Sequence, residues 1–247
     1  MYWCLGLTLA NDIGAKPKFG YGAETKLVRF LPFHGREWPV VNVDMSTSEG
    51  ILRAKELGLT SSTRPAVELI VSSHFRFAAK ELFSTKHKGK VFTVFRNPID
   101  REVSLLLHKQ KSDPSFTLSN LTDNWLTRNL VGKDVPETLT SEDLEAAKEI
   151  VQTKIIVGLE SRFVKSFDRF NDFLGIKIRT RSTRGKCVRE YSKSKMETNN
   201  DNKDNGKSDE LEAIAKMNSF DVLLYKYVEG LFNEQDLVST VNMGDSS

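Results

Sequence analysis

The sequence predicts an α/β fold in which a mainly parallel sheet is covered by helices on both faces. Short runs of β-branched and aromatic residues recur along the 247-residue chain, as strands prefer. Capped or amphipathic helical segments separate these runs, and this alternation is typical of parallel sheets. The chain is long enough to bury a large core, and its 39% hydrophobic and 28% charged residues are typical of a globular protein.

The elements of the first part of the chain are short. Three apolar runs are predicted to be strands: Leu27–Leu31, Val40–Val43 and Leu69–Val71. Two segments are predicted to be helices: residues 1–14 and Ala78–Phe83. Ser46 and Glu49 have the spacing of a capping box, so a further helix is expected to begin there and to end at Gly58.

The clearest strand-to-helix unit lies at the centre of the chain. Val91–Phe95 is β-branched or aromatic throughout, Asn97 suits an N-cap, and Pro98 suits the first helical turn. Arg96 is therefore expected between the carboxyl end of a strand and the amino end of a helix, where open α/β sheets bind anionic ligands. Ser104, about two turns further on, is placed to offer its hydroxyl to the same anion. An ordinary connection with a surface arginine is the alternative, and this segment alone does not separate the two.

The rest of the chain continues the alternation. Five segments are predicted to be helices: Asn120–Leu130, Ser141–Thr153, Glu160–Leu174, Asp209–Asn218 and Phe220–Asn233. Lys154–Val157 is predicted to be a strand, and the low-complexity segment 196–208 a mobile loop. Because no repeat or domain boundary is evident, residues 1–235 are predicted to form a single domain, followed by a disordered tail over 236–247.

Composition argues against several classes of protein. The net charge of +3 gives no whole-chain attraction to nucleic acid, so no nucleic-acid partner is expected. Two cysteines are too few for a disulfide scaffold or a zinc site, and the four histidines lack metal-ligand spacing, so no metal is expected. The sequence contains no apolar run long enough to span a bilayer.

Basic residues are concentrated in one segment, Lys177–Lys195, where Glu190 is the only acidic residue. Three interpretations of this segment stay open: a solvated loop, a loop that covers a cofactor, and a docking strip for an anionic acceptor such as a sulfated glycan. A solvated surface is the commonest role of such a run. Aromatic residues are sparse in it, which argues against base stacking.

The string FRNPIDREVSLL resembles the 3′-phosphate-binding segment of sulfotransferases that use 3′-phosphoadenosine 5′-phosphosulfate (PAPS). The similarity is greatest to the Golgi carbohydrate branch, which includes the heparan sulfate 2-O-sulfotransferases. In that family, the arginine before Asn/Asp-Pro and the serine eight residues later bind the 3′-phosphate. The resemblance assigns these roles to Arg96 and Ser104, and an arginine fork fits phosphate oxygens well.

Other segments resemble the same family in the same order. Leu69–Phe83 is similar to the segment that carries the catalytic base, a histidine twenty-two residues before the phosphate-binding arginine, and His74 has this spacing to Arg96. Three further segments resemble the family: Asn124–Gly132, Val157–Leu174 and Asn218–Gln235. The resemblance extends from about Val40 to Gln235.

This resemblance implies a P-loop-like three-layer fold and the transfer of a sulfuryl group from PAPS to a hydroxyl of a carbohydrate acceptor, in the Golgi. Such catalysis depends on positioning, charge neutralisation and a base that removes the hydroxyl proton. His74 is the expected general base, and Arg128 is a further expected contact to the cofactor. Trp125 beside it is expected to pack in the core.

One element of the family is not found in the sequence. This is the loop P-x-[ST]-G-[GT]-[ST]-[ST], which holds the 5′-phosphosulfate; Met1–Ile13 resembles the helix that follows it, so the domain is expected to be N-terminally incomplete. A non-catalytic relative that binds a nucleotide or a partner protein is therefore an alternative. A P-loop kinase is another, but it requires G-x-x-x-x-G-K-[ST], which the sequence lacks. A basic interaction module acting through Lys177–Lys195 is the last.

Overall fold

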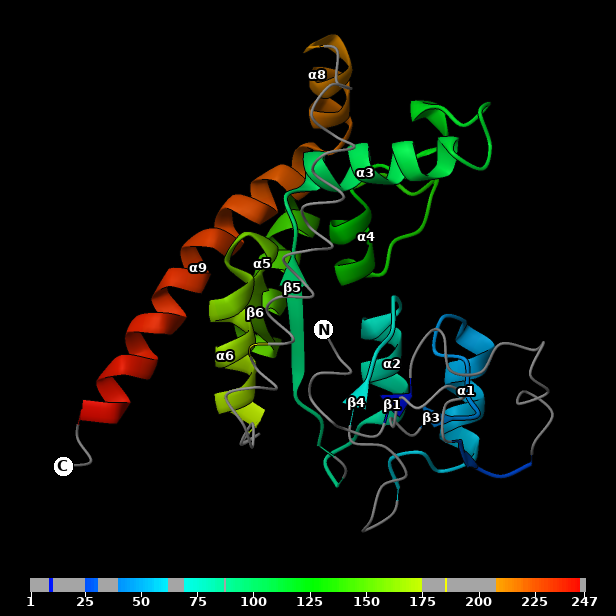
Figure 1. The fold of residues 1–247 in the computed structure, drawn as a ribbon, viewed down its shortest axis with the longest axis vertical. Helices are drawn as coiled ribbons and strands as arrows, with labels where there is room; N and C mark the ends of the chain where they lie inside the picture. The colour runs from blue at the N-terminus through cyan, green and yellow to red at the C-terminus, as the bar shows by residue number, and fades with distance from the viewer. Residues whose placement is uncertain are drawn as a thin grey trace. The chain divides into compact units, whose positions relative to one another are not determined.

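The computed structural model describes residues 9–10, 25–30, 40–61, 69–86, 88–174, 185 and 208–244 of the chain. The chain divides into two compact units, Met1–Lys90 and Val91–Ser247 (Figure 1). The single domain predicted over residues 1–235 spans both units and stays a prediction. The basic segment Lys177–Lys195, apart from residue 185, and all but the last residue of the predicted loop over 196–208 lie outside the described residues; Ser208 begins a helix.

The first unit contains a small mixed sheet and two helices. Its strands are β1 (Leu9–Ala10), β2 (Arg29–Phe30), β3 (Val40–Val41) and β4 (Leu69–Ile70), in the order β2-β3-β1-β4. β1 pairs in parallel with β3 and β4, whereas β2 is antiparallel to β3. The predictions for β2, β3 and β4 are confirmed. The helix predicted over residues 1–14 is wrong at Leu9–Ala10, because these two residues pair with strands on both sides.

Helix α1 (Ser48–Glu56) confirms a predicted helix but begins at a different cap. Thr47 is the N-cap, and its hydroxyl accepts the N–H of Gly50 at 3.0 Å. The expected cap, Ser46, is engaged elsewhere, since its hydroxyl donates to Asp44 Oδ1 at 2.6 Å. Gly58 ends the helix as predicted, with a φ of +72° that glycine adopts at low cost.

The core of the first unit lies between its helices and its sheet. Helix α2 (Phe75–Leu82) covers most of the predicted helix Ala78–Phe83 and packs against α1. Buried side chains from β3, α1, α2 and the segments that follow β3 and α1 form this core: Val41, Val43, Met45, Ile51, Ala54, Leu59, Ala78 and Leu82.

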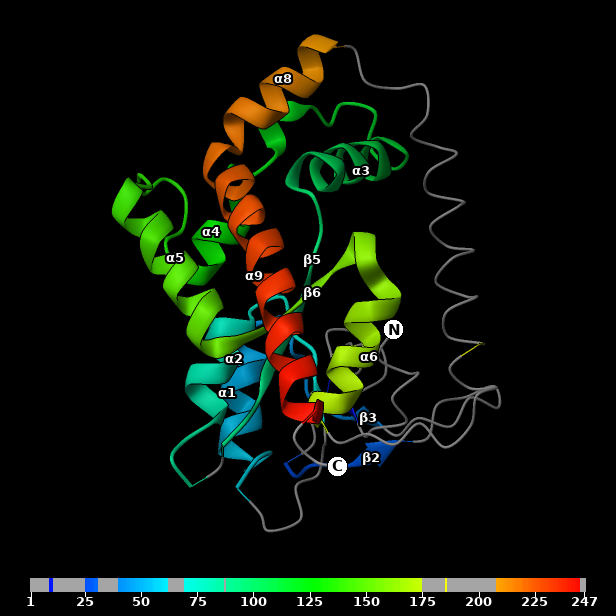
Figure 2. The ribbon, with the colours of Figure 1, turned by 90° about the vertical axis from the view of Figure 1, so that its left-hand side faces the viewer.

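The second unit is built around two parallel strands, β5 (Val91–Phe95) and β6 (Ile155–Leu159). Its helices are α3 (Pro98–Gln110), α4 (Trp125–Val131), α5 (Ser141–Lys154), α6 (Phe163–Leu174), α8 (Ser208–Met217) and α9 (Ser219–Gly244), with short 3₁₀ turns η4 (Leu118–Asn120) and η5 (Glu160–Arg162). Helices α5, α6 and α9 all pack against β6 (Figure 2). Helix α9 continues to Gly244, past Gln235, where the tail was predicted to be disordered.

Helix α6 covers one face of the two strands. Its apolar side buries Phe163, Phe167 and Phe170, as the amphipathic pattern predicts. The Phe170 ring lies 4.6 Å from the ring of Phe92 on β5. The close approach depends on Gly158 in β6, because a Cβ atom there would lie 2.5 Å from Phe170 Cζ.

Within the described residues, side chains form hydrogen bonds to the backbone of β6 on the edge away from β5. The N–H of Val157 donates to Gln235 Oε1 at 3.4 Å, and its carbonyl accepts from Arg169 Nη1 at 3.0 Å. The N–H of Leu159 donates to Ser166 Oγ at 2.8 Å. We name Ser166, Arg169 and Gln235 the edge clasp.

The α/β class and the parallel pairing of β5 and β6 are confirmed. The helix-rich second unit and the mixed sheet of the first unit do not by themselves establish the three-layer arrangement. Among the described helices, none combines the length and the apolar character needed to cross a bilayer.

Candidate functional site

The connection from β5 to α3 has the local geometry that the sequence predicts. Asn97 is the N-cap of α3, and its Oδ1 accepts the N–H of Ile99 at 2.9 Å and that of Asp100 at 3.4 Å. Pro98 takes the first helical position, where it has no N–H to leave unpaired. Because the first amides of α3 are capped, an anion at this end would be held by side chains and by the helix dipole.

Arg96 lies at the carboxyl end of β5, beside Glu160 at the carboxyl end of β6. The parallel register pairs Phe95 with Leu159, which places the two following residues at the same edge of the sheet. Arg96 Nε is 3.9 Å from Glu160 Oε2, too far for a hydrogen bond. Nε is buried and lacks a hydrogen-bond partner among the described residues. A buried charged donor in this state is costly, so the geometry favours a ligand that accepts from Arg96.

Ser104 lies on α3, on the side away from the face that the helix buries. The buried residues of α3 are Pro98, Glu102 and Leu106. Ser104 is two residues from Glu102, which is about 200° around the helix axis. The structure therefore places Ser104 on the same strand-to-helix unit as Arg96 and outside the core of the second unit.

Tyr225 of α9 brings further polar groups to this edge of the sheet. Tyr225 is buried, and its hydroxyl interacts with Ser161, the second residue after β6. Burial raises the pKa of the Tyr225 hydroxyl, and the carboxylates of Glu229, Glu160 and Asp100 raise it further. Tyr225 lies in the predicted similar segment Asn218–Gln235, but its place at this edge of the sheet could not be predicted, since its partners lie on other elements.

His74, the predicted base, is the N-cap residue of α2 in the first unit. Its backbone N–H donates to Ser72 Oγ at 3.0 Å, and Ser72 Oγ donates to the carbonyl of Met45 at 2.6 Å. The imidazole is exposed and makes no hydrogen bond within the part of the chain that the structure describes. Ser72 thus fixes the turn that carries His74, while the catalytic role of His74 stays a prediction.

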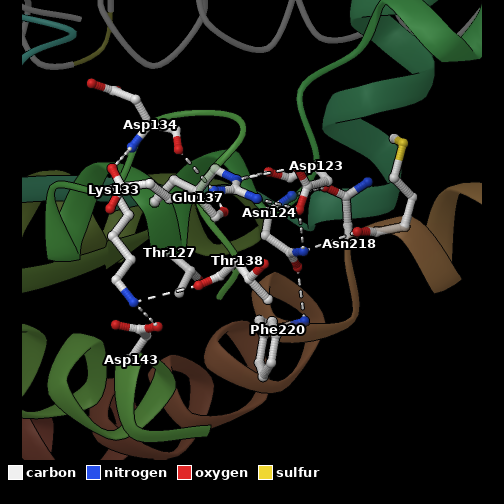
Figure 3. A network of polar contacts seen from close by, with 12 residues as sticks. Asp123, Asn124, Thr127, Lys133, Asp134, Glu137, Thr138, Asp143, Asn218 and Phe220 are labelled. Carbon is white, nitrogen blue, oxygen red and sulfur yellow. Dashed lines mark hydrogen bonds and ion pairs between the residues drawn. The ribbon is translucent and has the colours of Figure 1, made fainter. Parts of the chain in front are cut away.

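Arg128, in the last turn of α4, is buried in a polar network; Figure 3 shows Asp123, Asn124 and Glu137 of this network. Its Nε donates to Asp123 Oδ1 at 3.1 Å, its Nη2 donates to Asp123 Oδ2 at 3.0 Å, and its Nη1 donates to the Glu137 carbonyl at 2.7 Å. These bonds tie the loop after α4 to the turn before it. The geometry gives Arg128 a structural role, and its contact with a cofactor stays a prediction.

Helices α4 and α9 cap each other's first turns. Asn124, the N-cap of α4, accepts the N–H group of Phe220 at 2.9 Å (Figure 3) and that of Asp221 at 3.2 Å. Asp221 in turn accepts the N–H groups of Leu126 at 2.9 Å and Thr127 at 2.8 Å. We name Asn124 and Asp221 the cap pair. Two segments that resemble the sulfotransferases are thereby joined, so these polar residues are explained by helix capping.

Two carboxyl groups of the second unit are buried, those of Glu102 on α3 and Asp221 on α9. Glu102 is 1% exposed and pairs with Arg101 Nη1 through Oε1, while its Oε2 has no hydrogen-bond partner among the described residues. Burial raises the pKa of Glu102, and the nearby charge of Arg101 lowers it less. Burial likewise raises the pKa of Asp221, against its hydrogen bonds from Thr127 and Leu126. The charged sequence around Glu102 gave no indication of its burial.

A cavity of about 280 Å³ lies between α3 and α8. Its lining is mixed apolar and polar: Val103, Leu106, Leu107, Gln110, Glu210 and Ile214. The predicted site residues do not line it. In the described ranges, no group of three or more His, Cys, Asp or Glu side chains is arranged to hold a metal ion.

Comparison with known proteins gives no relative: no family model matches the chain, and no curated protein or solved structure matches it significantly. The functional argument therefore depends on the geometry at the ends of β5 and β6 and on the resemblance of the segments described above.

Proposed function

We propose that this chain is a PAPS-dependent sulfotransferase domain with a P-loop-like three-layer fold, acting on a hydroxyl of a carbohydrate acceptor. The observation that carries the proposal is Arg96: a guanidinium at the carboxyl end of a parallel strand, with a buried Nε that lacks a hydrogen-bond acceptor. A phosphate group supplies such acceptors in the geometry that an arginine fork prefers.

In this proposal, Arg96 and Ser104 hold the 3′-phosphate of PAPS. The capped amino end of α3 adds a favourable dipole, because the positive end of the helix lies next to the anion. PAPS supplies the sulfuryl group when bound. His74 accepts the proton of the acceptor hydroxyl, the role of general base that the resemblance assigns to it.

Binding of adenosine 3′,5′-bisphosphate, measured by calorimetry, tests the nucleotide site. We expect Arg96→Ala to weaken binding about 10- to 100-fold, as the loss of a charge-assisted hydrogen bond predicts. Lys109→Ala is the matched control, because Lys109 is an exposed cation in the last turn of the same helix. Equal affinities of the wild type and Arg96→Ala would refute the site.

Transfer of labelled sulfate from PAPS to a panel of glycans tests the reaction. We expect transfer by the wild type and loss of transfer in His74→Ala, with nucleotide affinity unchanged in that variant. Nucleotide binding without transfer to any glycan would instead favour the non-catalytic relative.

A further inference from the structure

A second arginine lies next to Ser104 on α3. Asn97, Arg101 and Ser104 follow one another at spacings of four and three residues, which places them in one line along the helix surface. Arg101 is therefore the neighbour of Ser104 on the turn that leads back toward Arg96. Neither the sequence pattern nor the proposed function has assigned Arg101 a role.

The guanidinium of Arg101 is held from two directions. It lies over the indole ring of Trp125, with Cζ 4.2 Å from the ring centroid, and its Nη1 pairs with the buried Glu102. Stacking and a paired carboxylate together reduce the freedom of a long side chain, so less entropy is lost when it binds a ligand.

Arg101 nevertheless keeps donors for a ligand. Its side chain is 28% exposed. Among the described residues, no hydrogen-bond acceptor contacts its Nε or its Nη2, and neither atom is a buried unpaired donor.

We propose that Arg101 is a second arginine of the phosphate site, donating from Nε and Nη2 to the 3′-phosphate that Arg96 and Ser104 bind. This inference rests on the proposed function, because it names a further binding residue of the same site. Two guanidinium groups around one phosphate provide charge neutralisation that a single arginine and a hydroxyl do not.

The test compares two ligands that differ only in the 3′-phosphate, adenosine 3′,5′-bisphosphate and adenosine 5′-monophosphate. The ratio of their dissociation constants measures what the 3′-phosphate contributes. We expect Arg101→Gln to weaken bisphosphate binding about tenfold or more and to leave monophosphate binding within about twofold. A purely structural role would change the affinities for both ligands alike, and would leave their ratio unchanged.

Two further variants make the result decisive. The double variant R101Q/E102Q removes the paired carboxyl group together with the arginine, so it stays folded if Arg101→Gln alone is destabilised by an unpaired Glu102. Arg162→Gln is the matched control, because Arg162 is an exposed arginine that also lies over a ring, that of Phe232 at 5.7 Å.

The outcomes separate the two proposals. If R101Q/E102Q prefers the bisphosphate over the monophosphate as strongly as the wild type does, while Arg96→Ala loses this preference, the role of Arg101 is overturned and the proposed function stands. A wild type that binds both nucleotides equally, or neither, refutes the 3′-phosphate site and the role of Arg101 with it.

Discussion

Arg101 interacts electrostatically with both buried carboxyl groups behind α3, those of Glu102 and Asp221. Each carboxyl has a pKa that burial raises, so the folded protein binds protons more tightly at these sites than the unfolded chain does. The contribution of these two groups to stability is therefore fully present only at pH values below their unfolded pKa values. It falls as the pH rises from the unfolded pKa of such a group toward its raised folded pKa.

Glu102→Gln is expected to remove part of the loss of stability that the folded protein undergoes as the pH rises. A neutral amide fills the same volume without a charge to bury, so the variant is expected to gain about 1 kcal/mol relative to the wild type at pH 7, and less at pH 4. Urea unfolding at the two pH values measures the difference. Glu149→Gln, an exposed glutamate on α5, is the control, and an equal effect at both pH values would contradict the prediction.

At the scale of elements, the cap pair joins two helices whose starts are far apart in the chain. Asn124 adopts a left-handed conformation with φ of +45°, which asparagine tolerates better than most residues. Asn124 thus contributes both a left-handed backbone conformation and a side-chain oxygen that caps α9. A substitution that changes only one of them separates capping from backbone strain.

Asn124→Gly keeps the left-handed backbone accessible and removes the cap of α9. It is expected to cost about 1–2 kcal/mol, and Asp221→Ala about 2–3 kcal/mol because the cap that it removes is buried. The double variant is expected to cost less than the sum of the two, since each single change already loosens the shared junction. Denaturant unfolding gives all three values, and strict additivity would argue against one junction.

Gly158→Ala is expected to destabilise the contact between β6 and α6. The added methyl group meets the Phe170 ring, so we expect a loss of about 1–3 kcal/mol from overpacking. Phe170→Leu in the same chain makes room for the methyl group and is expected to recover part of the loss. Thermal unfolding of the two single variants and the double variant checks this; no recovery would place the strain elsewhere.

At the scale of the whole molecule, each compact unit has its own buried core. Ile51 is fully buried in the first unit and Val228 in the second. Ile51→Ala is expected to cost about 2–5 kcal/mol and to lower hydrogen-exchange protection in α1 and α2, with α5 and α9 unchanged. Val228→Ala is the reciprocal control. An equal fall of protection throughout the chain would support the single domain that the sequence predicts.

Local signals predicted much of the fold. The unit from Val91 to Gln110 follows from strand propensity, the Asn97 cap and Pro98, all of which act within a few residues. Where two neighbouring residues compete, as Ser46 and Thr47 do for the cap of α1, the pattern alone does not decide, because Asp44 takes the hydroxyl of Ser46.

The candidate site was predicted only in part. Arg96 was identified because its position at the end of a strand is a local property. The hydrogen bonds of Arg128 and the burial of Glu102 could not be predicted. The loop that accepts from Arg128 and the elements that bury Glu102 are brought together only by the fold. Side-chain charge gives the chemistry that a residue can perform, but its partners determine whether that chemistry is used for structure or for a ligand.

The edge clasp on β6 has a consequence for the behaviour of the protein at high concentration. An open strand edge invites hydrogen bonding from another copy of the chain and is a common origin of fibrous aggregates. Here the N–H groups of Val157 and Leu159 and the carbonyl of Val157 already bond to Gln235, Ser166 and Arg169, so these groups are not available to a strand from another copy of the chain.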